Sequence, residues 1–464
     1  MRVACLLVLA LGALAACRPP AAELPRELGE LAAGRTARAW VELTPQADLA
    51  ALRRDFAARG AGRLARRAAV AAALSALAAE SRAGLQPLLD DLRRRRQLHE
   101  VRALSVVNGL LVEATAEAFR ELAKSPRVAA LVAESESEVP GWAADRPPPP
   151  GDGRRTSWAI GAVEAEAAWS RGLDGGGVVV AAIDSGASAV HEQLRDGFLG
   201  GACGWRDPRG RSAEPRDGAF GHGTGVLSAA VGRNVGGVTL GVAPGARWSA
   251  CAALPAGRYN NLRALDCADW VLDVARPDVL IAAWLLPGDP CDPALVRVVE
   301  AWRAAEILPV FAAGNLGPEP GANRSPANYA HLYPGSASAL AVGGLTSAGE
   351  LLPRSARGPE RCDARAPFPS LVAPAADVTT ALPLTASTYR QADGTSYAAG
   401  FVAGAAAILL QRDPEASVAE LEAALREGAV DLGPPGPDDR FGHGRLNVPG
   451  ALAALARRPG TPLR

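Results

Sequence analysis

The sequence has no excess of charge, and lysine is almost absent from it. Its 49 basic and 49 acidic residues cancel among 464 positions. A balanced chain of this kind gives no electrostatic reason to bind nucleic acid or an anionic membrane surface. We therefore expect no nucleic-acid partner.

Spacings typical of metal ligands are also missing. The sequence contains no Cys-x-x-Cys or His-x-x-His pattern, and protein zinc sites usually carry such pairs. It therefore predicts no metal site and no required cofactor, and it leaves structural calcium open. Of the seven cysteines, Cys5 and Cys17 lie near the N-terminus. The other five are an odd number, so at least one stays unpaired if all pairing is internal.

The chain begins with an apolar run that is too short to span a bilayer as a stable helix. Arg2 precedes the run at residues 3–11, and small residues follow it, which is typical of a signal peptide. Leu14-Ala15-Ala16-Cys17 resembles a bacterial lipobox, in which the cysteine becomes the lipidated N-terminus. Ordinary cleavage after Ala15 is the alternative. We predict a signal peptide at 1–17, a tether at 18–37, and export to the bacterial cell envelope with a lipid anchor, or otherwise secretion.

Residues 38–134 predict a small α+β domain. A strand at 39–43 precedes helical periodicity at 48–96, which is broken near Gly60-Ala61-Gly62. Strands at 101–107 and 110–114 flank Asn108-Gly109, a pair that favours tight hairpin turns. A helix at 116–123 and a strand at 128–132 complete a β-α-β-β-α-β order, which is the ferredoxin-like arrangement.

The rest of the chain predicts a larger α/β domain behind a linker. Residues 135–156 are acidic at first and then rich in proline and glycine, which is typical of an extended linker. Over 157–456, apolar runs at 178–183, 247–252, 279–284, 308–312 and 339–343 alternate with helical stretches. This alternation predicts a doubly wound, mainly parallel sheet with helices on both faces. Residues 457–464 form a tail.

Three short segments carry an acid, an imidazole and a hydroxyl among small residues. Asp184 follows an apolar run, His222 lies between two glycines, and Ser396 precedes an apolar helix. A serine becomes a nucleophile when a neutral imidazole accepts its proton and a carboxylate orients that imidazole. The chain has five histidines, and His222 is the only one that both lies between two glycines and precedes a helix of small residues. Taken singly, Asp184 would be an ordinary turn residue and Ser396 an ordinary helix N-cap.

A fourth segment offers an amide. Asn315 follows the apolar strand expected at 308–312. At the carboxyl end of a parallel strand its N–H could donate to the oxyanion of a tetrahedral intermediate, together with the backbone N–H of Ser396. An asparagine in a left-handed turn is the alternative interpretation.

With these segments in place, residues 157–456 resemble the subtilase (subtilisin-like serine peptidase) family, most closely its bacillopeptidase F-like branch. The order Asp, His, Ser is that of subtilisin. The resemblance rests on Asp184-Ser185-Gly186, 217–224, 240–246, 311–315, 325–329, 355–359, 394–396 and 442–447. It implies that Asp184, His222 and Ser396 are catalytic and that Asn315 is the oxyanion residue.

The resemblance implies further roles. Substrate would lie as an extended strand against Ala283, Trp284, Leu285 and Gly314, and Cys251 would pair with Cys267. The domain at 38–134 resembles the inhibitory propeptide of subtilases, so the chain would be a zymogen that processes itself and carries its own intramolecular inhibitor. An independent adaptor domain is the alternative. The partners would be peptide or protein substrates, and the mature enzyme would be a monomer.

The chain departs from the family pattern at several positions. Tyr397 and Gly400 replace a methionine and a proline, Gly225 stands where this branch tends to have histidine, and Ala375 replaces a glycine. Leu285 replaces a glycine where a peptide backbone passes closely, and a side chain there obstructs substrate. We therefore expect some subsites to be partly filled and to favour small residues. The alternative function is a catalytically weak subtilase fold kept as a surface binding protein. A lipase or esterase is disfavoured because the Gly-x-Ser-x-Gly elbow is missing around Ser396.

Overall fold

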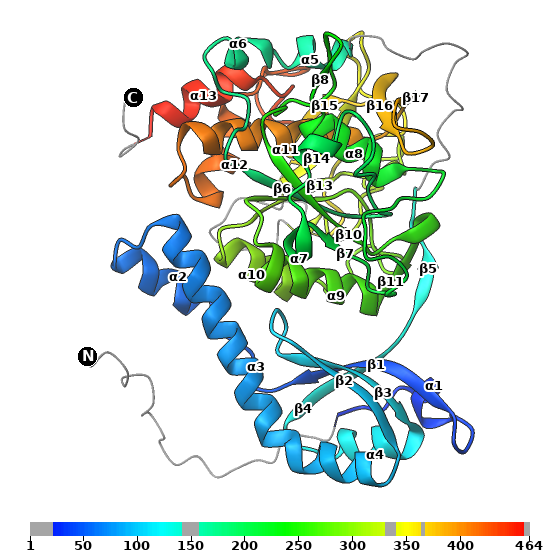
Figure 1. Ribbon diagram of the computed structural model, residues 1–464. Coiled ribbons are helices and arrows are strands. Elements are labelled where there is room, and N and C mark those ends of the chain that lie inside the picture. Colours follow the sequence, from blue (N-terminus) through cyan, green and yellow to red (C-terminus); the bar gives the residue numbers. More distant parts are fainter. Residues whose placement is uncertain (1–21, 142–156, 330–339, 363–366, 459–464) are drawn as a thin grey trace.

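The computed structural model describes residues 22–141, 157–329, 340–362 and 367–458. The predicted signal peptide with Cys17, most of the predicted linker and the predicted tail lie outside these residues. Two units are visible in Figure 1: an N-terminal unit, residues 22–133, and a larger unit, residues 157–458, which is called the peptidase unit after the resemblance described above.

The N-terminal unit is a four-stranded antiparallel sheet with helices. After α1 (Arg26–Gly29), its elements are β1 (Thr36–Leu43), α2 (Leu49–Ala58), α3 (Arg63–Arg94), β2 (Leu98–Leu104), β3 (Gly109–Thr115), α4 (Ala116–Ala123) and β4 (Val128–Ala133). The strand order β2-β3-β1-β4 places the first and last strands side by side. The elements follow the predicted β-α-β-β-α-β succession, with the first helix divided at Gly60-Ala61-Gly62.

The predicted two-residue hairpin turn at Asn108-Gly109 is wrong. Strand β2 ends at Leu104, and a turn over 105–108 leads into β3. The backbone N–H groups of Ser105 and Val106 donate to the carboxylate of Asp269, at 2.6 and 3.1 Å. Asp269 lies on a helix of the peptidase unit, so a tertiary contact replaces the last ladder bonds of the hairpin.

The peptidase unit contains a seven-stranded sheet of order β15-β14-β13-β12-β6-β10-β7, and every neighbouring pair in it is parallel. The strands are β6 (Val179–Asp184), β7 (Trp205–Arg206), β10 (Arg247–Ala252), β12 (Val279–Ala282), β13 (Leu308–Ala312), β14 (Leu340–Leu345) and β15 (Leu371–Pro374). The predicted fold class is confirmed. The sequence reading missed β7 and β15, which are short edge strands.

Helices cover both faces of this sheet, which is why its strands are mostly apolar. In β6, Val180 and Ala182 belong to the core beneath α8 (His222–Val231) and α11 (Thr395–Arg412). Ala181 and Ile183 belong to the opposite core, beneath α9 (Asn261–Trp270) and α10 (Val296–Ala304). The two cores therefore share β6 by strict alternation.

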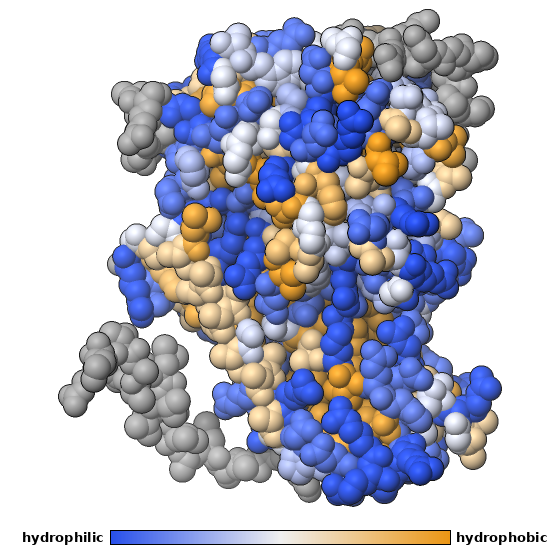
Figure 2. Space-filling view, viewed as in Figure 1, coloured by the Kyte–Doolittle hydropathy of each residue, from blue (hydrophilic) through white to orange (hydrophobic). Residues whose placement is uncertain are grey.

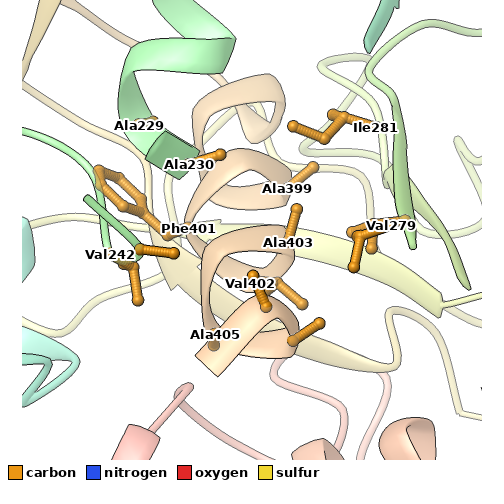
Figure 3. Packing of buried hydrophobic residues seen from close by; sticks show 14 of the residues in the cluster. Ala229, Ala230, Val242, Val279, Ile281, Ala399, Phe401, Val402, Ala403 and Ala405 are labelled. Carbon is orange, nitrogen blue, oxygen red and sulfur yellow. The ribbon is translucent and has the colours of Figure 1, made fainter. Parts of the chain in front are cut away.

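Helix α11 runs through the centre of the first core, surrounded by side chains of α8 and β12 (Figure 3). A Cβ atom on Gly400 would lie 2.7 Å from the carbonyl oxygen of Val226. Only glycine lets α11 approach α8 this closely, so Gly400 is a packing residue in this chain.

Shorter elements complete the unit. They are α5 (Trp158–Ala162), α6 (Glu166–Trp169), η1 (Arg195–Gly197), α7 (Gly201–Gly204), β8 (Asn234–Val235), β9 (Val238–Thr239), η2 (Pro255–Gly257), β11 (Arg258–Asn260), η3 (Val271–Ala275), β16 (Val378–Leu382), β17 (Thr388–Ala392), α12 (Val418–Glu427) and α13 (Val448–Ala456).

Two disulfides cross-link the peptidase unit. Cys251 of β10 is bonded to Cys267 of α9, and Cys291 is bonded to Cys362. The second pair was not anticipated, because its members are 71 residues apart and only the fold brings them together. Among the cysteines that the structure describes, Cys203 alone has no disulfide, and it is exposed.

The two units are joined by buried ion pairs at the start of α3. The guanidinium groups of Arg63 and Arg67 lie 2.9 and 3.0 Å from the carboxylate of Asp278. Burial alone would raise the pKa of Asp278, but the two cations hold it below its usual range. Arg66 adds a third ion pair with Glu306 at 2.9 Å.

Helix α3 is long and apolar enough to cross a membrane by length and composition alone. At its start, the buried residues Arg63 and Arg67 contact the peptidase unit. At its end, the buried residues Leu85, Leu89 and Leu92 pack on the four-stranded sheet. A pale-orange stripe of mild hydrophobicity follows the helix between the units in Figure 2. Helix α3 therefore connects the two units and packs against both of them.

Candidate active site

The four predicted catalytic residues come from four separate elements of the peptidase unit. Asp184 is the last residue of β6, His222 is the first of α8, Ser396 is the second of α11, and Asn315 follows β13 by three positions. In a parallel α/β sheet, strand ends and the following helix starts meet at one edge. The sheet therefore gathers residues that are up to 212 positions apart (396 minus 184).

Asp184 and His222 form a buried hydrogen-bonded pair. The Nδ1 atom of His222 lies 2.7 Å from Oδ1 of Asp184, and the same oxygen accepts the backbone N–H of Ser185 at 2.7 Å. A carboxylate only accepts, so the proton of the neutral imidazole lies on Nδ1. Nε2 is then the basic nitrogen, as a general base for a serine requires.

Aromatic side chains fix the plane of the imidazole. The ring of Phe220 stacks on His222 with centroids 6.2 Å apart and an interplanar angle of 8°, and the ring of Tyr397 lies at 6.0 Å. Arg390 donates to the hydroxyl of Tyr397 at 3.0 Å and lies over the Phe220 ring. A Cβ atom on Gly225 would lie 3.1 Å from Tyr397, so the glycine makes room for this tyrosine.

The amide of Asn315 is held in one orientation. Its Oδ1 accepts the backbone N–H of Thr395 at 3.0 Å and the Thr395 hydroxyl at 3.1 Å. Its Nδ2 donates to the carbonyl oxygen of Gly141 at 3.3 Å. The hydroxyl of the neighbouring Ser396 donates to the carbonyl of Ala283 at 3.4 Å.

His222, Asn315 and Ser396 line one pocket together with the predicted substrate-binding residues Ala283, Trp284, Leu285 and Gly314. Residues 139–141 line the same pocket. They reach it through β5 (Glu136–Glu138), which pairs antiparallel with β11. Figure 1 shows β5 leaving the N-terminal unit and running along the side of the peptidase unit.

Leu285 is buried, and its side chain lies across Gly314. A Cβ atom built on Gly314 would be 2.7 Å from Cδ1 of Leu285. The leucine therefore fills space between the two segments that were predicted to bind substrate.

The sequence reading missed two parts of this site. It assigned residues 136–141 to a linker, although Val139 with a proline and a glycine after it is an apolar interruption that could have signalled a docked segment. It also missed the support that Arg390 and Phe220 give to the imidazole, because nothing in their local sequence places them near His222. Among the residues described, no group of three metal-ligating side chains occurs.

The fold and this geometry define a class: serine hydrolases built on a parallel, doubly wound sheet, with an acid–imidazole pair, a serine at a helix start and an amide donor at one sheet edge. The subtilase family model matches residues 175–444, and the chain belongs to that family of serine-type peptidases.

The chain is 30% identical over 427 residues to Bacillopeptidase F of Bacillus subtilis, covering 84% of this chain and 29% of that protein. It is 31% identical over 360 residues to an alkaline protease of Shouchella clausii, covering 76% and 81% of the two chains. It is also 33% identical over 300 residues to Subtilisin Savinase of Lederbergia lenta, covering 63% and 97%. The chain thus spans less than a third of Bacillopeptidase F but most of the subtilisins.

Proposed function

We propose that this chain is an exported serine endopeptidase made as a zymogen that cleaves its own N-terminal unit. The observation that carries the proposal is the buried pair between His222 Nδ1 and Asp184 Oδ1, 2.7 Å apart, in a site whose pocket is lined by His222, Ser396 and Asn315. Ser396 attacks the scissile carbonyl, and His222 takes its proton and passes it to the leaving amine. Asp184 orients the imidazole and stabilises its charged form.

Asn315 supports this chemistry electrostatically. Its Oδ1 is engaged by Thr395, so Nδ2 needs no reorganisation when negative charge develops on the carbonyl oxygen. A preorganised donor of this kind stabilises the tetrahedral intermediate more than water can.

A fluorophosphonate probe tests the catalytic proposal directly. We expect the probe to label wild-type protein at Ser396, because an activated serine hydroxyl reacts with it and an ordinary one does not. Labelling is read by intact mass and by mapping the modified peptide, with His222→Ala as the unreactive reference. An unlabelled, folded wild type would contradict the enzyme proposal and favour a surface binding protein.

The N-terminal unit is proposed as an intramolecular inhibitor. Support comes from the buried contacts of Arg63 and Arg67 with Asp278 and from β5, which leads residues 139–141 into the candidate active site. Substrate entering the same pocket would have to displace this segment.

Release of the N-terminal unit after cleavage is expected to depend on pH through Asp269. Burial raises the pKa of Asp269 to about 6, against the lowering effect of the Val106 N–H and of Arg102, while Asp273 raises it further. An aspartate in water has a pKa of about 3.9. A pKa raised in the complex means that the complex holds the proton more tightly, so association is strongest below about pH 4. It weakens as the pH rises through 6.

The measurement is the fraction of N-terminal unit that stays with the immobilised, processed peptidase unit at pH 5 and at pH 8. We expect clearly more retention at pH 5, with an affinity about tenfold higher than at pH 8, because pH 5 lies one unit below the raised pKa of Asp269. Asp269→Asn should flatten this dependence, whereas Asp196→Asn, an exposed aspartate elsewhere on the unit, should keep it. Equal retention of wild type at both pH values would disprove the role of Asp269.

Lipid anchoring through Cys17 is part of the same proposal and rests on the lipobox resemblance. We expect Cys17→Ser to move the protein from the detergent phase to the aqueous phase on partition, because the several acyl chains of a bacterial lipoprotein anchor stably. Cys203→Ser is the control, as this exposed cysteine lies in the folded peptidase unit. Unchanged partition of Cys17→Ser would leave simple secretion.

A further inference from the structure

The peptidase unit encloses two arginine side chains of α3. Arg63 and Arg67 are one helical turn apart, so their side chains project from the same face of the helix, and the two residues are only 3% and 7% exposed. Both guanidinium groups donate to Oδ1 of Asp278, at 2.9 and 3.0 Å, and to the carbonyl oxygen of Glu306, at 3.0 and 3.1 Å. A guanidinium has several N–H donors in one plane and can bond to several acceptors at once, which a single ammonium group cannot match. The contact is therefore suited to arginine rather than to lysine.

The acceptors of this contact belong to the framework of the peptidase unit. Arg67 also donates to the carbonyl oxygens of Ala305, just after α10, at 3.3 Å and of Arg276, just after η3, at 3.0 Å. Carbonyl groups at helix ends lack partners within the helix and carry partial negative charge. The other carboxylate oxygen of Asp278 accepts the backbone N–H of Val179 at the start of β6, at 2.9 Å. The peptidase unit thus holds these oxygens itself, and we call Asp278 with the carbonyl groups of residues 276, 305 and 306 the arginine receptacle.

The peptidase unit also contacts the first turn of α3. Gly62 at the N-cap position has no side chain with which to cap the helix, and Oε2 of Glu415 accepts the backbone N–H of Arg63 at 2.6 Å. A carboxylate at this place satisfies a helical N–H group and compensates the positive end of the helix. A Cβ atom on Gly62 would lie 2.6 Å from the same oxygen, so the glycine leaves room for the carboxylate. The peptidase unit thus contacts a helix start made of a glycine, an arginine and a second arginine one turn later.

The arginine receptacle and the candidate active site lie at opposite edges of the seven-stranded sheet. Asp278 directly precedes β12 and Glu306 precedes β13, whereas Asp184 ends β6 and Asn315 follows β13. A strand of 6 residues such as β6 is roughly 20 Å long. A segment bound in the receptacle therefore leaves the pocket around His222 open, and a chain with a linker can reach both sites.

From these contacts we propose that the peptidase unit binds helices that begin with Gly-Arg-x-x-x-Arg, and that after loss of the N-terminal unit the arginine receptacle recruits protein substrates that present such a helix. Before that step, α3 is the resident ligand. The proposal rests on the proposed peptidase and zymogen function and adds a class of substrates to it. Charge complementarity supports it, since the carboxylates of Asp278, Glu306 and Glu415 face the arginine-bearing helix start. The contacts with Gly62, Arg63 and Arg67 involve only features that another helix can share.

The first experiment tests the receptacle without any need for catalysis. The full chain, kept uncleaved by Ser396→Ala, carries Arg63→Ala and Arg67→Ala, which leaves space for two guanidinium groups, and methylguanidinium is the probe. We expect a saturable rise in Tm of at least about 2 °C, which methylammonium at the same ionic strength should not produce. Adding Asp278→Asn should remove the rise. Arg94→Ala, which changes an arginine side chain that is 70% exposed, is the matched control and should show no rise.

The second experiment compares two substrates of the processed enzyme. In both, residues 61–82 of this chain are joined to a cleavable peptide by about 20 glycine and serine residues, which span roughly 25 Å. In one of them, Arg63→Gln and Arg67→Gln remove the guanidinium groups. We expect KM to be at least about tenfold lower for the arginine version and kcat to be unchanged, because the contact is the same in the bound substrate and in the transition state. The free peptide of residues 61–82 should compete with the arginine version alone.

The outcomes separate the receptacle from the peptidase function. The same Tm response to methylguanidinium in the double variant and in Arg94→Ala would overturn the receptacle, and Arg67→Ala alone is used in the same way if the double variant does not fold. Equal KM values for the two substrates, with normal fluorophosphonate labelling, would overturn the recruitment of substrates alone. Absence of both labelling and cleavage would overturn the proposed function and the substrate class with it, while the methylguanidinium result still decides whether the receptacle binds guanidinium groups.

Discussion

Ser396→Ala is expected to leave the chain at full length. Self-cleavage would use the same hydroxyl as cleavage of other substrates, so its removal should abolish both. The expected loss in turnover is on the order of 10⁶-fold, the effect known for the triad serine of subtilisin, a member of this family. The measurement is the intact mass of protein purified from a protease-deficient host, together with hydrolysis of a peptide substrate.

Ser387→Ala is the control for this variant. Ser387 is an exposed residue between β16 and β17, and its recorded hydrogen bond uses the backbone N–H, which alanine retains. It should mature as the wild type does. Maturation of Ser396→Ala in the same host would show that another protease removes the N-terminal unit.

Asn315→Ala is expected to lower kcat by about 100- to 1,000-fold, the loss known for the corresponding oxyanion donor in subtilisin. The reason is that its Nδ2 would act on the charge that develops in the transition state, whereas most substrate contacts come from elsewhere in the pocket. KM should therefore change much less than kcat. Steady-state kinetics on a peptide substrate measure both.

Two comparisons separate this effect from misfolding. Asn234→Ala changes an exposed asparagine whose side chain bonds to Thr239 in a surface hairpin, and it should keep wild-type kcat. Asn315→Ala should still react with the fluorophosphonate probe, only more slowly, because His222 and Asp184 remain. A variant whose KM rises while kcat stays constant would assign Asn315 to substrate binding instead.

The sequence alone determined the larger architecture and the candidate site residues. Strand ranges such as 247–252 and 308–312 agree with β10 and β13 residue for residue, because strands covered on both faces are mainly apolar and so are visible as runs. Asp184, His222 and Asn315 could be singled out because each stands where a strand ends or a helix begins among glycines. Such positions need small residues around them, and the local sequence records that need.

The tertiary structure alone decided the contacts between distant segments. The Cys291–Cys362 disulfide and the Arg63–Asp278 ion pair join residues whose partners have no local signature. The turn after β2 differs from the two-residue turn predicted from the sequence. In the structure, Asp269 of the peptidase unit accepts the backbone N–H groups of Ser105 and Val106 there. The hydrogen bond between Asn315 and Gly141 and the position of the Leu285 side chain beside Gly314 likewise join segments that are separate in the sequence. Hydrophobic periodicity encodes which face of an element is buried, but it carries no information on which segment comes to lie against that face.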